Sequence, residues 1–100
     1  MEEKVSETPI PFSELLKELE VKPKSSAYIL IEAEPLEIPG IMEKLAEIEN
    51  IKSADVVTGV YDIIVFLEGE DQNEIGRIVV RDIHSIKGVK KATTCMVVKL

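Results

Sequence analysis

The feature that most constrains the fold is an internal repeat, because the chain resembles itself when it is shifted by 35 residues. Residues 29–31, Ile-Leu-Ile, fall on residues 64–66, Ile-Val-Phe. The pattern Ile-x-x-Ile-Lys at residues 48–52 falls on the same pattern at residues 83–87. The register holds without a gap, which indicates two structural units of equal length and similar design.

Each of the two units is predicted to contain a strand, a helix and a second strand. Short runs rich in β-branched residues predict the strands, and apolar residues at helical spacing predict the helices. An Asp71-x-x-Glu74 capping pattern opens the second helix, and Gly88 lies where a helix-ending glycine is expected. The expected strands are residues 27–34, 51–58, 61–68 and 89–100, and the helical stripes are Ile41, Met42, Leu45 and Ile48, then Ile75, Ile78, Val79, Ile83 and Ile86. This βαββαβ order predicts an α+β, ferredoxin-like fold with a four-stranded antiparallel sheet and two helices on one face.

Residues 1–26 are predicted to form an N-terminal extension to that domain. The first eleven residues are polar, and Ser13 is a suitable N-cap for a short helix with apolar Leu15, Leu16 and Leu19. The predicted organisation is therefore an extension with a short helix over residues 1–26 and one folded domain over residues 27–100.

The predicted strands are apolar on both of their faces. Residues 63–67 are apolar without interruption, and Tyr28 and Leu30 alternate with further apolar residues in the first strand. A sheet with helices on one face ordinarily has a polar second face, so a large apolar second face requires a cover. Two covers are open: a second copy of the chain, which predicts a homodimer through the sheet, or the short N-terminal helix of the same chain.

The charge balance argues against nucleic acid as a direct partner. The formal net charge is −7, and the only local basic cluster is Lys87, Lys90 and Lys91, which we interpret as a solvated strand start. Binding to phosphates requires clustered Lys and Arg. The longest apolar run, residues 63–67, is far shorter than a membrane span. We therefore expect no direct contact with DNA and no membrane segment.

No set of residues in the sequence indicates a catalytic site or a metal site. His84 is the only histidine, at the predicted end of the second helix, and Cys95 is the only cysteine, in a strand where we expect it to be buried and reduced. No further His or Cys completes a metal-ligand set, and no nucleotide-binding motif is present. We expect no catalytic residue, metal or cofactor in a cytoplasmic protein, whose sparse Asn and Gln are typical of thermophiles.

The joint between the two units, Gly59-Val60-Tyr61-Asp62, carries a candidate ligand site. Gly59 can adopt a positive φ and lets a ligand approach the backbone, whose free N–H groups can hold a carboxylate. Asp62 can pair with an amine, and Tyr61 offers a ring and a hydroxyl, so the loop suits a zwitterion such as an amino acid. The alternative is structural: Gly59 makes the turn, Asp62 caps it and Tyr61 packs.

Residues 58–98, TGVYDIIVFLEGEDQNEIGRIVVRDIHSIKGVKKATTCMVV, resemble the effector-binding domain of the Lrp/AsnC (feast/famine) family, often called the RAM domain. The resemblance extends over roughly residues 27–100 and rests on two motifs, Thr-Gly-x-Tyr-Asp and Gly-Val-x-x-x-x-Thr. The matching positions are Thr58, Gly59, Tyr61 and Asp62 in the first motif and Gly88, Val89 and Thr94 in the second. The family's usual Arg-Thr before the closing Thr is replaced here by Lys91-Ala92.

The resemblance implies a sensor of small molecules, typically amino acids, whose members dimerise through their sheets and assemble further, often into octamers. It makes Gly59, Val60, Tyr61 and Asp62 the candidates for ligand binding, with Thr94 as an additional candidate. Full-length members carry an N-terminal helix-turn-helix domain, for which the residues before the first strand leave no room. The chain is therefore expected to be a stand-alone RAM domain that regulates transcription indirectly, by assembling with full-length relatives, without binding DNA itself.

Two other functions remain open on the sequence. A small enzyme of the dimeric α+β barrel type shares this architecture, but it needs a polar cavity with inward His, Arg or Asn. A pure assembly or adaptor protein needs no ligand at all. An amino-acid-binding ACT-type domain also shares the topology, and the Gly-x-Tyr-Asp motif favours the RAM domain over it.

Overall fold

The chain forms the predicted βαββαβ order in a computed structural model that describes residues 11–12 and 24–100. The helix expected after Ser13 falls outside the described residues. The elements, in order, are β1 (Ser25–Ala33), the 3-10 turn η1 (Pro35–Glu37), α3 (Ile38–Ala46), β2 (Ile51–Val56), β3 (Ile63–Gly69), α4 (Gln72–Arg77), the π-helical turn η2 (Ile78–Ile83) and β4 (Val89–Met96).

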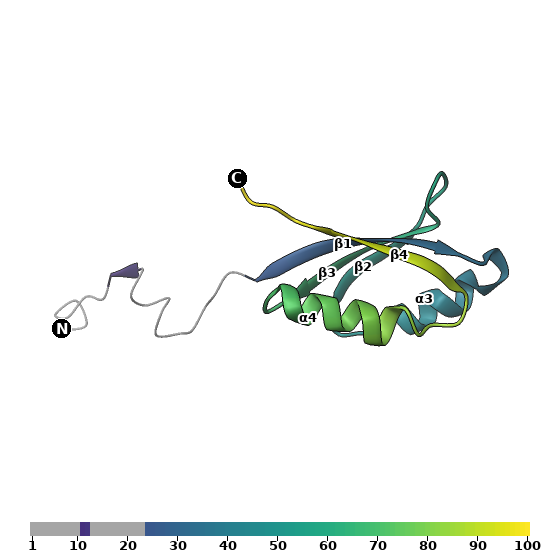
Figure 1. Ribbon diagram of the computed structural model, residues 1–100, viewed down its shortest axis with the longest axis horizontal. Coiled ribbons are helices and arrows are strands. Elements are labelled where there is room, and N and C mark those ends of the chain that lie inside the picture. The colour runs from purple at the N-terminus through teal and green to yellow at the C-terminus, as the bar shows by residue number, and fades with distance from the viewer. Residues whose placement is uncertain (1–10, 13–23) are drawn as a thin grey trace, which may run out of the picture.

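The four strands form one antiparallel sheet in the order β2-β3-β1-β4. The first strand of each unit, β1 or β3, therefore lies in the middle of the sheet, and the second strand of each unit forms an edge. Both helices cover the same face, so the molecule has two layers with the other sheet face open (Figure 1). The predicted ferredoxin-like α+β fold is confirmed.

The hydrophobic core lies between this sheet and its helices. Alternate residues of the central strands point into it, because successive strand side chains face opposite sides. Leu45 of α3 and Ile83 of η2 pack against them from the helix layer and are fully buried. The central-strand core residues are Ala27, Ile29, Ile31 and Ala33 of β1 and Ile63, Val65 and Leu67 of β3.

The predicted capping signal at the start of the second helix is confirmed. The Asp71 carboxylate accepts a hydrogen bond from the Glu74 N–H at 2.8 Å, and the Glu74 carboxylate accepts one from the Glu70 N–H at 2.7 Å. These bonds satisfy backbone donors that have no partner within the helix. Gly88 does not end the helix as expected, because η2 already ends at Ile83; its φ of +98° instead turns the chain into β4.

The strand bounds differ from the sequence-based expectation: β1 covers Ser25–Ala33 instead of residues 27–34, and β3 covers Ile63–Gly69 instead of residues 61–68. β2 ends at Val56 instead of residue 58, because residues 57–62 form a closed turn. β4 ends at Met96 instead of residue 100, because its partner β1 begins at Ser25 and the Val97 N–H makes the last bond, to the Ser26 oxygen.

Cys95 also differs from the expectation, because it is exposed and not buried. Cys95 pairs directly with Tyr28 of β1, and directly opposed residues share a face of the sheet. Tyr28 belongs to the open face, so Cys95 lies on the open face as well.

Candidate functional site

The hairpin between β2 and β3 has a defined backbone structure. The Val57 N–H donates to the Asp62 carbonyl oxygen at 2.8 Å and closes the turn. The Asp62 N–H donates to the Ile31 oxygen at 2.8 Å, so the base of the hairpin is joined to the central strand β1. Its tip projects beyond the sheet (Figure 1), and Val60 at this tip is 82% exposed.

Asp62 has a structural partner that the sequence did not reveal. Its Oδ2 accepts a hydrogen bond from the Ala33 N–H at 2.8 Å, across 29 positions of the chain. Ala33 is only 3% exposed, so its N–H needs a partner inside the protein. The side chain thus extends the β1–β3 hydrogen bonding one step beyond Ile63. Within the described residues, Oδ1 accepts no hydrogen bond.

Gly59 and Tyr61 differ in what holds them in place. Gly59 has a φ of +119°, and a Cβ atom built on it would meet no atom within 4 Å. A glycine is therefore favoured here by the positive φ and not because a side chain would collide with a neighbour. The surroundings of Gly59 are open. Tyr61 is half-buried beside the exposed Val60. The loop therefore combines open backbone, a partly buried ring and a fixed carboxylate.

Thr94 is not brought to this loop within one protomer. It pairs with Ile29 and shares the helix side of the sheet with it, on the edge strand β4. β1 separates β4 from β3, and the hairpin directly precedes Ile63, the first residue of β3. Within one protomer the strand order therefore separates Thr94 from the hairpin by the width of β1 and β3.

The open face of the sheet is a second candidate surface. Tyr28, Leu30, Ile64 and Phe66 form its apolar centre, where Tyr28 is 46% exposed and its ring centroid lies 5.0 Å from that of Phe66. Charged side chains, including the cross-strand pair Glu32 and Lys91, lie on the same face toward its ends. An apolar centre with a polar rim is the usual composition of a protein interface.

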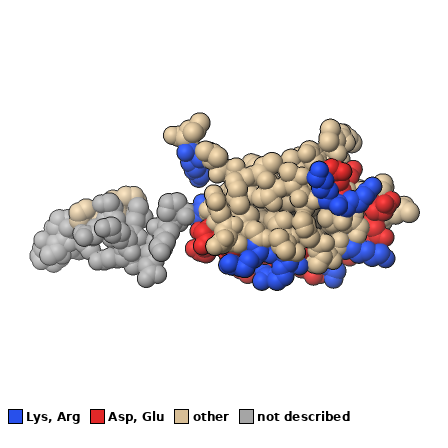
Figure 2. Space-filling view, in the orientation of Figure 1, with Lys and Arg blue, Asp and Glu red and all other residues tan. Residues whose placement is uncertain are grey.

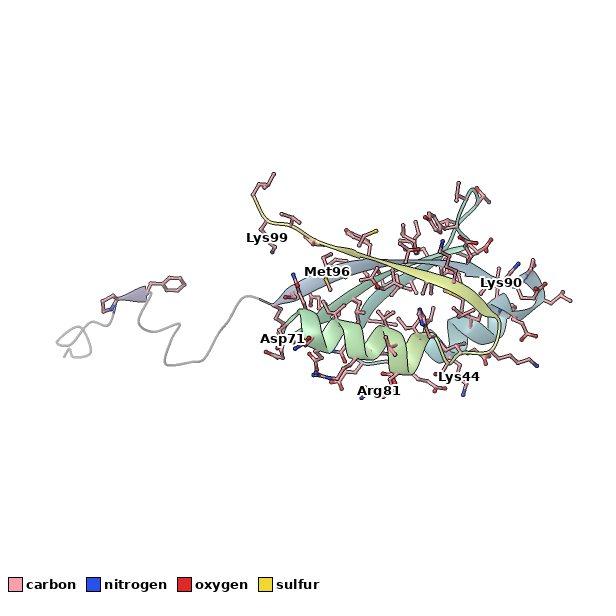
Figure 3. All side chains as sticks on the ribbon, in the orientation of Figure 1. Lys44, Asp71, Arg81, Lys90, Met96 and Lys99 are labelled. Atoms are coloured by element: carbon pink, nitrogen blue, oxygen red, sulfur yellow. The ribbon has the colours of Figure 1, made fainter. Side chains whose placement is uncertain are left out.

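A groove on the helix layer was not anticipated from the sequence. It has a volume of about 800 Å³ and lies between α3 and the end of η2 with the turn that follows it, and its lining residues include Lys44, Glu47, Asp82 and Ser85. The polar lining residues lie on the polar faces of two helical segments. The spacing of apolar residues, from which the helices were predicted, does not indicate where such polar faces form a groove. Figure 3 shows Lys44 and Arg81 on this helix side of the molecule.

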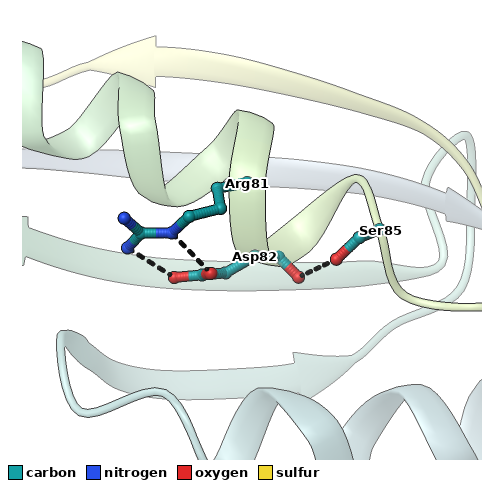
Figure 4. A network of polar contacts seen from close by, with 3 residues as sticks. All are labelled: Arg81, Asp82 and Ser85. Atoms are coloured by element: carbon teal, nitrogen blue, oxygen red, sulfur yellow. Dashed lines mark hydrogen bonds and ion pairs between the residues drawn. The ribbon is translucent and has the colours of Figure 1, made fainter.

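Asp82, at the edge of this groove, is held by its neighbours (Figure 4). Arg81 donates to it from Nε at 3.0 Å and from a terminal nitrogen at 3.2 Å, and the Ser85 hydroxyl donates to the Asp82 carbonyl at 3.2 Å. The hydrogen bonds from Arg81 lower the pKa of the Asp82 carboxyl, and the same contact raises the pKa of Arg81. Both partners of the ion pair are accessible to water, so it adds little to stability.

The described part of the chain was also searched for clusters of metal-ligating side chains. No group of three or more His, Cys, Asp or Glu side chains there is arranged to hold a metal ion. His84 is exposed and caps the end of η2, as the sequence predicted. None of the helices formed by residues 11–12 and 24–100 is long and apolar enough to cross a membrane.

Comparisons with known sequences place these features in a family context. The family model for the Lrp/AsnC ligand binding domain matches residues 26–100. An uncharacterized HTH-type transcriptional regulator of Pyrococcus horikoshii is 29% identical over 68 residues, which are 68% of this chain and 43% of that protein. A homocitrate synthase of Sulfurisphaera tokodaii is 34% identical over 59 residues, but these are only 13% of the enzyme. The chain thus spans less than half the length of these curated relatives.

Solved structures show the same fold. TTHA0845 from Thermus thermophilus has 25% identity and a TM-score of 0.72, with 76% of this chain and 95% of that chain covered. E. coli AsnC has 16% identity and a TM-score of 0.73, with coverages of 88% and 68%. The regulator NMB0573 of Neisseria meningitidis, solved as a complex with L-Met, has 17% identity and a TM-score of 0.71, with coverages of 84% and 55%.

Proposed function

Because the chain belongs to the Lrp/AsnC ligand binding domain family, we propose that it senses a free amino acid at its β2–β3 hairpin and self-associates through its open sheet face. The observation that carries this proposal is the hairpin itself. Its Gly-x-Tyr-Asp residues are fixed to the central strand by the Asp62 contacts, while its tip is exposed to solvent.

The chemistry of the hairpin fits a zwitterion. The positive φ of Gly59 and the open space around it leave the backbone accessible to the carboxylate of a ligand. Oδ1 of Asp62 can pair with the ammonium group of a ligand, since within the described residues only Oδ2 accepts a hydrogen bond, from Ala33. Tyr61 supplies a wall for the ligand side chain. Thr94 enters this proposal only as a residue contributed from another copy of the chain.

The open sheet face supports self-association. Its apolar centre, with Tyr28 and Phe66 in ring contact, is the type of surface that a stable dimer buries. A symmetric dimer uses the same patch on both subunits, so one self-complementary apolar face is sufficient. Higher assemblies, and mixed assemblies with full-length Lrp/AsnC proteins, then bring hairpins of different dimers together.

The proposed biological role is indirect regulation of transcription. The net charge of −7 disfavours contact with DNA by this chain. Several relatives are HTH-type transcriptional regulators, whose matched part is about half of their length or less. The match with this protein covers 95% of the solved chain of TTHA0845. In TTHA0845 the domain therefore occurs with little further sequence attached to it. We propose that ligand binding changes how this module assembles with full-length regulators.

Calorimetric titration of the full chain with each of the twenty amino acids tests the ligand proposal, with methionine first because of the L-Met complex of the Neisseria regulator. We expect saturable heat with at least one of them. The variant Asp62→Asn keeps an oxygen for Ala33 but removes the charge, so it should weaken binding about tenfold or more, because hydrogen bonds to charged groups are the stronger ones.

The matched control is Glu43→Gln, which makes the same change of charge on the exposed surface of α3. It should leave binding unchanged. Absence of heat with all twenty amino acids, or equal binding by wild type and Asp62→Asn, would contradict the proposed site.

A further inference from the structure

The end of β1 is attached to two different parts of the molecule through two consecutive residues. The Ala33 N–H donates to Oδ2 of Asp62 in the hairpin at 2.8 Å. The Glu34 N–H donates to the carbonyl oxygen of Gly88, also at 2.8 Å. Successive backbone N–H groups of an extended strand point to opposite sides, so one bond faces β3 and the other faces β4. The strand end thereby joins the hairpin to the turn that precedes β4.

Regular pairing between β1 and β4 is interrupted at this point. The pairing register shifts between Glu32 and Ala33, which leaves one extra residue, Lys90, in β4. Such a β-bulge disrupts the hydrogen bonds between the two strands locally. Beyond the bulge, the bond from Glu34 to Gly88 holds β1 to the β4 side.

Side chains at this end of the sheet add little to that attachment. Figure 2 shows charged side chains of both signs below the hairpin, and Figure 3 shows Lys90 at the same end of the sheet. The Lys90 Nζ lies 4.0 Å from a carboxylate oxygen of Glu34, and both side chains are more than half exposed. An ion pair with this distance and exposure contributes little to stability. The place of the Ala33 N–H therefore depends on the backbone bond to Gly88.

We propose that the backbone of Glu34 positions the ligand-binding carboxylate of Asp62, by means of its hydrogen bond to Gly88. The bond fixes the strand end, and the strand end presents the neighbouring Ala33 N–H to the carboxylate. This inference rests on the proposed function and extends the ligand site to the opposite side of β1. Loss of the bond leaves the hairpin sequence intact, but it releases the carboxylate from the place where it meets the ammonium group of the ligand.

The test replaces Glu34 with proline in the full chain. Glu34 has a φ of −68° and a ψ of 124°, which suit proline, but proline has no N–H and its ring displaces the Gly88 oxygen. Hydrogen exchange of the Ala33 amide, followed by NMR, should become about two- to tenfold faster, because the net contribution of one hydrogen bond corresponds to a factor of that size. The amide of Glu68, at the other end of β3, is the internal reference and should keep its rate. An ester bond in place of the Glu34 N–H removes the same donor without a ring, and it should give the same result even if the proline variant does not fold.

Two matched variants separate positioning from a general loss of stability. Glu34→Ala removes the ion pair with Lys90 but keeps the N–H, so exchange at Ala33 should stay within about twofold of wild type. Asn50→Ala removes the hydrogen bond of 3.0 Å from the Asn50 side chain to the Glu68 oxygen, at the far end of β3. It should speed exchange at Glu68 and not at Ala33. Equal acceleration at both amides in Glu34→Pro would show a global effect and would overturn the positioning role.

Calorimetric titration then connects the strand end to the ligand, with each of the twenty amino acids as probe and L-methionine first. Glu34→Pro should weaken binding about two- to tenfold, whereas Glu34→Ala and Asn50→Ala should bind like wild type. A wild type that binds none of the twenty would overturn the proposed ligand site together with this inference. A wild type that binds, with the same affinity in Glu34→Pro, would overturn the positioning role alone.

Discussion

At the scale of single residues, Asp62 shows how one side chain serves the fold while it remains available for a ligand. One carboxylate oxygen binds the buried Ala33 N–H and the other has no partner in the described part of the chain. The two interpretations of the hairpin motif, a structural cap and a ligand group, are therefore compatible. The structural one is visible in the hydrogen bonding, and the ligand role stays a prediction.

The structural role of Asp62 predicts different stabilities for two substitutions. Asp62→Ala leaves the Ala33 N–H buried without a partner and should reduce the free energy of unfolding by about 1–3 kcal/mol. Asp62→Asn keeps an acceptor oxygen and should cost clearly less. Urea unfolding at one fixed protein concentration measures both variants. Equal stabilities of the two variants would mean that the Ala33 contact does not matter.

At the scale of elements, the turn between η2 and β4 has little tolerance for change. Gly88 adopts a φ of +98°, and a Cβ atom placed on it would collide with the Cβ of Glu37. Its carbonyl oxygen accepts a hydrogen bond from the Glu34 N–H at 2.8 Å, which joins the turn to the end of β1. The turn of the second unit is thereby held against the end of β1 and against η1 of the first unit.

Gly88→Ala should therefore destabilise the protein by at least about 1–2 kcal/mol, the cost of a left-handed residue that carries a Cβ, before the contact with Glu37 is added. Gly40→Ala is the matched control, because Gly40 lies in α3 and a Cβ there meets nothing within 4 Å. That change should stabilise the helix by roughly 0.5–1 kcal/mol. Thermal unfolding of both variants checks the opposite signs, and a neutral Gly88→Ala would refute the argument.

At the scale of the whole molecule, the two layers leave one sheet face without a cover. The helix layer buries one side of β1 and β3, while Tyr28 and Phe66 remain accessible on the other side. A two-layer domain with an apolar outer sheet face gains free energy by burying that face against a copy of itself. The proposed assembly thus follows from the arrangement of layers and not from any single residue.

Phe66→Lys should convert the dimer into a monomer, with a dissociation constant raised about a hundredfold or more, because an unpaired charge is placed inside the interface. Val80→Lys is the control, since Val80 is an exposed apolar residue on the helix layer. It should leave the dimer intact. Sedimentation shows the oligomeric state, and circular dichroism shows whether each variant is folded. Dimeric Phe66→Lys would place the interface elsewhere.

Much of the fold was predictable from local patterns. The repeat at an offset of 35 residues, the runs rich in β-branched residues and the apolar residues at helical spacing predicted four strands, two helices and their order. The capping residues Asp71 and Glu74 act within one helical turn, so their contacts follow from spacing alone. The hairpin was likewise found from its motif, because its residues are contiguous.

The sequence by itself thus determined the elements, their order and the apolar character of both sheet faces. Tertiary structure alone decided that Asp62 bonds to Ala33, that Thr94 lies apart from the hairpin and that Cys95 is exposed on the open face. The physical reason is that periodicity reports the face of an element on which a residue lies, over a few neighbouring positions. Strand order and pairing register decide which distant residues meet, and these arise only when the two halves pack into one sheet.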